Sequence, residues 1–254
     1  MEFVAAQLVL LLESETSSRD ASRNGKQGGP KHGTERRRGP RDGATACRIE
    51  RGRVSVEIVC LDLEGVLIPE IWVEFAEAAD IPELKRTTRD EPDYDKLMQF
   101  RLDAMNAHGM GIDEVRETLA TIEPVPGARE FLDELRGIAQ VIIVSDTFIQ
   151  FAQPIMPKLG NPTIFCNDLV VDRDGKLAGY RMRCKDTKAT TVKALHEMGF
   201  ETIASGDSHN DIGMIENSKA GFLFRSTEEI EAAHPEIPAY EEFDDLLAAI
   251  EAAL

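Results

Sequence analysis

The stretch VEIVCLDLEGVLI, residues 56–68, carries the strongest fold signal in the chain. Its first six residues are mostly apolar and several are β-branched, which predicts a buried strand. Two carboxylates, Asp62 and Glu64, follow the strand at once. In sheets of parallel strands, ligands bind at the carboxyl ends of the strands. The stretch therefore predicts a buried parallel strand with acidic groups at its functional end.

The rest of the chain alternates between strand and helix patterns. We expect further strands at 140–144, 162–166, 201–205 and 220–224, helices at 128–136, 187–198, 212–217, 227–233 and 243–253, and an antiparallel hairpin of 169–172 with 177–183. The segment 150–159 is predicted to be helical, with a break at its two prolines. This alternation predicts an α/β fold with a doubly wound parallel sheet.

One stretch departs from the alternation. Residues 71–79, 93–107 and 113–122 have helical patterns and no strand between them. We therefore predict a small helical cap, 69–123, inserted after the first strand of a core made of 56–68 and 124–254. Residues 1–55 are polar and lack apolar periodicity, so we expect a disordered extension, or a segment that precedes the native start.

Charge divides the chain in the same place. Residues 1–55 hold 11 basic and 7 acidic side chains, a net +4, while the whole chain carries −17, which leaves −21 for the remainder. An acidic body of this kind repels nucleic acid and anionic membranes. The basic run 35–41 is expected to be a solvated tail, with a nucleic-acid-binding arm as the alternative.

Location is predicted from what the sequence lacks. No window approaches the roughly 18 apolar residues of a membrane-spanning helix, and residues 3–12 do not fit a secretory signal. Cys47, Cys60, Cys166 and Cys184 form no C-x-x-C pair. We therefore expect a cytoplasmic protein with reduced thiols.

Three polar clusters follow predicted strands: residues 62–66, 145–147 and 206–211. A lysine, Lys188, lies near the start of the helix before the fourth strand. A single aspartate after a strand is often only a cap or turn residue. Three clusters at successive strand ends, together with the lysine, instead indicate one shared site.

In order and spacing these clusters resemble the haloacid dehalogenase-like phosphatase superfamily, over about residues 56–254. Within it the chain resembles the phosphoserine phosphatases, in particular the bifunctional phosphoserine phosphatase/phosphoserine:homoserine phosphotransferase branch. The residues that carry the resemblance are CLDLEGVLIPEIW (60–72), SDTF (145–148) and GDSHND (206–211). Most superfamily members have aspartate where this chain has Glu64, whereas the bifunctional branch has this glutamate.

The resemblance implies a Rossmann-like core and an Mg²⁺-dependent mechanism with a phospho-aspartyl intermediate. Asp62 would be the nucleophile, and Glu64 the general acid and then the general base. Mg²⁺ would be held by the side chains of Asp62 and Asp207 and by the backbone carbonyl of Glu64. Asp211 would support the metal-binding groups.

The remaining site residues are implied in the same way. Ser145, Lys188 and Asn210 would bind the phosphate, and Asp146 would be a further substrate-binding residue. The alternatives are a helix cap for Ser145 or Asp146 and a solvated position for Lys188. His209 is expected to lie at the surface.

The cap would select the substrate. Glu70 is a candidate partner for an ammonium group and Arg101 for a carboxylate, with Tyr94 packing nearby. Tyr94 and Arg101 are seven residues apart, which places them on one helix face. The alternative for Arg101 is an ion pair with a neighbouring acid, and Trp72 is expected to serve packing.

The resemblance thus implies an enzyme that hydrolyses O-phosphoserine in serine synthesis, with homoserine as a second acceptor left open. The alternatives are a phosphatase for another small phosphomonoester and a non-catalytic binding protein on the same fold. A small-molecule substrate and a homodimer are implied, and no nucleic acid or membrane partner.

Overall fold

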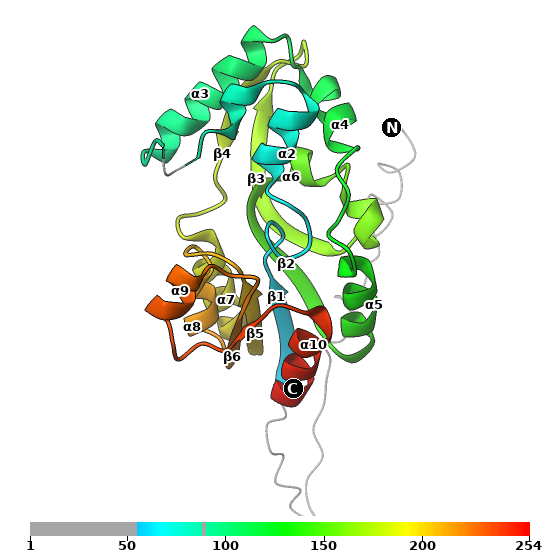
Figure 1. The fold of residues 1–254 in the computed structure, drawn as a ribbon, viewed down its shortest axis with the longest axis vertical. Helices are drawn as coiled ribbons and strands as arrows, with labels where there is room; N and C mark the ends of the chain where they lie inside the picture. The colour runs from blue at the N-terminus through cyan, green and yellow to red at the C-terminus, as the bar shows by residue number, and fades with distance from the viewer. Residues whose placement is uncertain (1–54, 88–89) are drawn as a thin grey trace, which may run out of the picture. The chain divides into compact units, whose positions relative to one another are not determined.

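Strand β1 (Val56–Leu61) lies inside a sheet of seven strands within residues 55–87 and 90–254, the part that the computed structural model describes (Figure 1). The order is β4-β3-β2-β1-β5-β6-β7. The other strands are β2 (Gln140–Phe148), β3 (Thr163–Val171), β4 (Leu177–Arg181), β5 (Phe200–Gly206), β6 (Ala220–Phe224) and β7 (Ala239–Tyr240). All neighbours are parallel except β3 and β4. The predicted doubly wound α/β sheet is confirmed.

Helices cover both faces of the sheet (Figure 1). Helices α5 (Ala128–Ile138) and α10 (Phe243–Ala253) pack on one face, and α7 (Thr187–Glu197) and α8 (Ile212–Glu216) on the other. Alternate side chains of β1 enter the two layers, since Val59 belongs to one apolar cluster and Cys60 to the other. Helix α9 (Glu228–Ala233) contributes Ile230 to the cluster of Cys60. This burial on both faces explains the continuous apolar run in the sequence.

The insertion after β1 is helical, as predicted. It contains α2 (Ile71–Ala78), the 3-10 helix η1 (Pro82–Lys85), α3 (Tyr94–Ala107) and α4 (Ile112–Leu119). Helix α3 lies beside β4, and Asn106 Nδ2 donates to Leu177 O at 2.9 Å (Figure 1). The backbone N–H of Ile112 also donates to Gly175 O in the hairpin turn, at 2.8 Å. The β3–β4 hairpin therefore supports the inserted helices.

The strands differ from the prediction in three places. Strand β2 continues through Phe148, with a register shift after Val144. Strand β3 is continuous where we predicted two strands, because its backbone pairs first with β2 and then with β4 across the predicted gap. The two-residue strand β7 was not predicted. The predicted break at the prolines is confirmed, since α6 (Ile149–Ala152) and η2 (Met156–Leu159) are separate helices.

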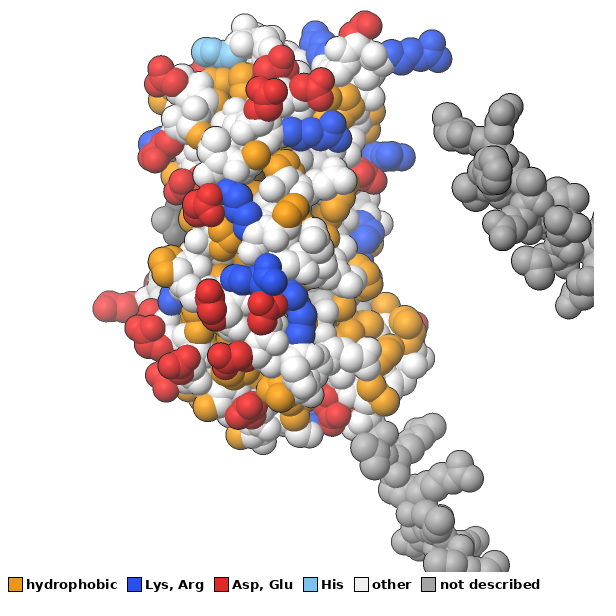
Figure 2. All heavy atoms as spheres, turned by 90° about the vertical axis from the view of Figure 1, so that its right-hand side faces the viewer, with side chains coloured by type: hydrophobic (Ala, Val, Ile, Leu, Met, Phe, Trp, Pro, Cys, Tyr) orange, Lys and Arg blue, Asp and Glu red, His pale blue; other side chains and the backbone are white. Residues whose placement is uncertain are grey.

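Charged side chains of both signs lie over the face that carries α4 and α5 (Figure 2). Several form ion pairs, such as Arg129 with Asp133 and Lys158 with Glu123, both at 2.6 Å. Two helices have side-chain caps, since Asp93 and Thr227 accept hydrogen bonds from the first turns of α3 and α9.

Several predictions lie partly outside the described residues. These include the disordered extension, apart from Ser55, and the state of Cys47. Cys60, Cys166 and Cys184 are free thiols. Within the described residues, no helix is long and apolar enough to cross a membrane.

Candidate active site

The loop after β1 brings Asp62 to the edge of the sheet. The backbone N–H of Asp62 donates to Ser205 O of β5 at 3.0 Å, and Gly65 N donates to Ile68 O at 2.9 Å to close the turn. Gly65 has φ of +75°, and a Cβ there would lie 2.4 Å from Asp207 Cγ. Glycine is therefore required both by the backbone angle and by the close approach of Asp207.

Lys188 lies between two buried carboxylates. Its Nζ is 2.9 Å from Asp62 Oδ2 and 2.7 Å from Asp211 Oδ1, and the residue is only 2% exposed. Burial alone would lower the pKa of Lys188, but the two carboxylates outweigh it and raise the pKa above its usual range. The lysine is therefore charged, and the alternative of a solvated position is wrong.

Three carboxylates gather at this end of the sheet: oxygen atoms of Asp62, Asp207 and Asp211 lie within 4.8 Å of one another. Burial, and then the charge of Asp211, raise the pKa of Asp207 to about 7. The same two causes raise the pKa of Asp62 well above its ordinary value, against the opposing effect of Lys188. One lysine does not neutralise this cluster, so its donor set fits a hard divalent cation.

Glu64 is held apart from that cluster. Its carboxylate accepts a hydrogen bond from Ile71 N at the start of α2, at 3.0 Å. Burial, and then the nearby Glu70, raise its pKa to about 7. The side chain is thus poised to exchange a proton near neutral pH. The predicted role of Glu64 in metal binding concerns its backbone carbonyl alone.

Polar groups from β2 line the side of the site that the sheet forms. Ser145 is buried in β2, where its Oγ accepts from Thr147 N at 3.2 Å, so it is not a helix cap. The carboxylate of Asp146 accepts hydrogen bonds from Asn210 Nδ2, at 3.1 Å, and from the hydroxyl of Thr187. Asp146 does not cap the next helix, because the cap position of α6 is Phe148. The ends of β1, β2 and β5 therefore meet as predicted.

The inserted helices supply the opposite wall. Glu70, Tyr94 and Arg101 line one cavity of about 220 Å³ together with Asp62 and Lys188. Arg101 is 5% exposed, and burial lowers its pKa to about 10. Among the described residues its hydrogen-bonding contacts are a backbone carbonyl and a sulfur, so no ion pair with a neighbouring acid is present there.

One residue of this region was not recognised in the sequence, and another does more than was expected of it. Thr187 directly precedes Lys188 and bonds Asp146, and the pair Thr187-Lys188 at a helix start was the signal available. Trp72 was expected only to pack, but it lines the cavity and contacts Arg101. His209 is exposed, as expected.

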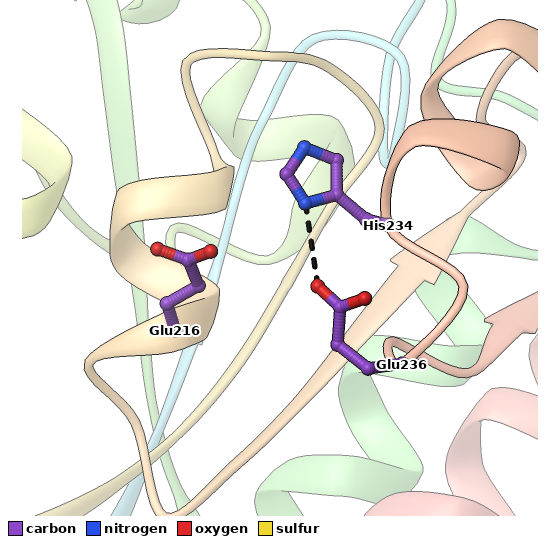
Figure 3. Close-up of side chains that lie close together, drawn as sticks. All are labelled: Glu216, His234 and Glu236. Atoms are coloured by element: carbon purple, nitrogen blue, oxygen red, sulfur yellow. Dashed lines mark ion pairs between the residues drawn. The ribbon is translucent and has the colours of Figure 1, made fainter.

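A second group of possible metal ligands lies elsewhere. Figure 3 shows Glu216 on α8 facing His234 and Glu236, with His234 Nδ1 3.5 Å from Glu236 Oε1. Both glutamates are exposed, and none of the three residues lines the cavity. We assign this group no part in the site.

A parallel sheet with a buried lysine and several carboxylates at the ends of its strands defines an α/β enzyme whose site lies at that edge. The chain belongs to the haloacid dehalogenase-like hydrolases, whose family model matches residues 56–219. The resemblance found in the sequence is thereby confirmed.

Two relatives are similar over most of the chain. Phosphoserine phosphatase ThrH of Pseudomonas aeruginosa is 47% identical over 75% of this chain and 93% of its own length. A phosphoserine phosphatase of Pseudomonas syringae pv. tomato is 45% identical over 77% of this chain and 82% of its own. Both relatives are named as phosphoserine phosphatases, as the sequence resemblance implies.

Solved structures share the fold. A phospho-aspartyl intermediate analogue of phosphoserine phosphatase superposes with a TM-score of 0.63 at 21% identity, covering 77% of this chain and 99% of that one. A substrate-bound phosphoserine phosphatase complex gives 0.60 at 22% identity, covering 74% and 93%. At these identities the comparison establishes the fold alone.

Proposed function

We propose that the chain is an Mg²⁺-dependent phosphatase that hydrolyses O-phospho-L-serine through a phospho-aspartyl intermediate on Asp62. The observation that carries the proposal is the buried pairing of Asp62 with Lys188, within a cavity that also contains Glu64 and Arg101. The two relatives named as phosphoserine phosphatases support the same substrate.

Asp62 acts as the nucleophile. Lys188 at 2.9 Å favours its ionised form, which is the form that attacks phosphorus. Lys188, Ser145 and Asn210 line the same cavity and bind the phosphate oxygens. Asp146 orients Asn210 through its hydrogen bond to Nδ2.

The carboxylates of Asp62 and Asp207 and the backbone carbonyl of Glu64 would hold Mg²⁺. When bound, this ion neutralises negative charge on the phosphate and on the attacking carboxylate. Asp211 keeps its neighbours in place, because it accepts hydrogen bonds from Lys188 Nζ at 2.7 Å and from Ser208 N at 3.1 Å.

Glu64 moves the protons. With a pKa raised to about 7, it can donate a proton to the leaving serine oxygen and then take one from the attacking water. Its hydrogen bond to Ile71 N fixes the carboxylate between the sheet edge and α2.

The inserted helices recognise the amino acid. Glu70 binds the ammonium group and Arg101 the carboxylate, with Tyr94 packing beside them. The cavity of about 220 Å³ is below the roughly 300–1,000 Å³ of sites for drug-sized ligands, which fits a small substrate. Residues 69–123 would thus act as a cap on a core made of 56–68 and 124–254.

Homoserine as a second phosphate acceptor is proposed because the sequence resembles the bifunctional branch at Glu64 and because Glu64 can deprotonate an alcohol as it does water. A homodimer and a cytoplasmic location remain predictions of the sequence.

The test is an assay with Mg²⁺ and O-phosphoserine, with and without homoserine. Free phosphate and serine are expected, and O-phosphohomoserine if homoserine is an acceptor. The Asp62→Asn variant is the control and should be inactive while folded. Turnover only of other phosphomonoesters would refute the proposed substrate, and no turnover of any would favour a binding protein.

A further inference from the structure

Trp72 is the only tryptophan of the chain and lies in the first turn of α2. Its ring centroid is 4.2 Å from Arg101 Cζ on α3 and 4.9 Å from the ring of Phe151 on α6. Phe75, one turn further along α2, packs edge-on against the same indole, at 6.4 Å. The indole is thus fixed by two aromatic rings and presents itself to the guanidinium.

Arg101 has few other groups to fix it. Nη2 donates to Arg86 O at 2.8 Å, and Nη1 is 4.0 Å from Met98 Sδ. Nε is buried and has no hydrogen-bond partner among the described residues. A buried guanidinium with an unused N–H group and no carboxylate among these contacts is prepared to bind an anion. Its stacking on Trp72 occurs where water is largely excluded, and there cation–π attraction is strongest.

We propose that Trp72 is a positioning residue that holds Arg101 for the substrate carboxylate and so selects phosphomonoesters that carry one. The inference rests on the proposed function and deepens it. A guanidinium that stacks through its face points its N–H groups outward from its edge, and those that are not bonded to Arg86 O can bind a carboxylate. Trp72 acts through Arg101 and does not bond the substrate itself.

The kinetic test compares two substrates that differ only in the carboxylate, O-phosphoserine and phosphoethanolamine. Trp72→Leu should raise KM for O-phosphoserine about ten-fold, the loss expected for a desolvated cation–π contact, and leave KM for phosphoethanolamine and both kcat values nearly unchanged. Trp72→Phe should keep KM for O-phosphoserine close to the wild-type value, because phenylalanine keeps an aromatic face for Arg101.

Phe131→Leu is the matched control, since it also removes a buried aromatic ring, one that stacks on Phe243 at 4.7 Å and does not line the cavity. It should affect both substrates equally. An equal rise in KM for both substrates in Trp72→Leu, or an unchanged KM for O-phosphoserine, would overturn the positioning role. If circular dichroism shows that Trp72→Leu does not fold, the positioning role is tested with Trp72→Phe and with the binding experiment below.

Binding can be read from the single tryptophan. In Asp62→Asn, which should bind substrate without turning it over, O-phosphoserine should change the emission of Trp72 in a saturable way, and phosphoethanolamine should not. Equal responses to both ligands, or no response to O-phosphoserine despite binding by calorimetry, would refute the inference. If the wild type binds O-phosphoserine with this response but does not hydrolyse it, the proposed activity is refuted. The inference that Trp72 positions Arg101 for a carboxylate is then still supported.

Discussion

Replacing Lys188 with methionine should destabilise the protein strongly. The change keeps the length of the side chain and removes the charge that lies 2.9 Å from Asp62 and 2.7 Å from Asp211. Both carboxylates are buried, so removing the cation leaves them uncompensated. Breaking a buried ion pair in this way costs about 3–5 kcal/mol. We expect that loss in the free energy of unfolding, measured in urea at pH 8 with a chelator present.

The loss should depend on pH. Lys188 lowers the pKa of Asp62 in the wild type, so the variant has a still higher pKa for this carboxyl in the folded state. A carboxyl whose pKa is raised by folding favours the folded state below its unfolded pKa, and that contribution disappears as the pH rises through the folded pKa. The difference in the free energy of unfolding between the variant and the wild type should therefore be larger at pH 8 than at pH 5.

An exposed lysine provides the matched control. Lys85 forms an ion pair with Glu77 at 2.6 Å, but the two side chains are 45% and 57% exposed. Lys85→Met should cost less than about 1 kcal/mol. A loss of that small size in Lys188→Met, or one that does not vary with pH, would refute the reasoning that Lys188 compensates buried charge.

Three further predictions concern activity. Lys188→Met should also lower kcat about 100- to 1,000-fold, as the loss of one preorganised phosphate-binding group does, and a smaller loss than ten-fold would argue against contact with the phosphate. Glu64→Gln should slow turnover about 100- to 10,000-fold while metal-dependent binding of O-phosphoserine, measured by calorimetry, persists; near-normal rates would remove its role in proton transfer. Gly65→Ala should raise the Mg²⁺ concentration for half-maximal activity about 10- to 100-fold, because the new Cβ displaces Asp207. Gly109→Ala is its control, with a similar φ of +70° and open space around the position, and an equal effect there would point to general strain.

Much of the sheet could be predicted because its local patterns agree with the final structure. The run 56–61 is apolar because both faces of β1 are covered, and Asp62 follows at the point where β1 ends. The proximity of Asp62, Ser145 and Asp207 followed from the rule that parallel strands end at one edge, whereas the role of Lys188, which lies on α7, was implied by the family resemblance. The three polar clusters therefore came together as expected.

Other features depend on contacts that no local pattern records. Strand β2 continues past Val144 because Phe148 pairs with Asn167 across the sheet. Strand β7 has two residues and exists only because β6 offers an edge. The stacking of Trp72 on Arg101 joins residues 29 positions apart, which depends on how α2 and α3 pack. Such tertiary contacts override local signals.

The central claim is that Asp62 takes up the phosphoryl group, and acid quenching of the enzyme during turnover of O-phosphoserine tests it most directly. Mass spectrometry of the digested protein should find one phosphoryl group on the peptide that contains Asp62. Hydroxylamine should release this group, as expected for an acyl phosphate, and the Asp62→Asn variant should not carry it. A phosphoryl group on another residue, or steady turnover with none trapped on the protein at any quench time, would contradict the account.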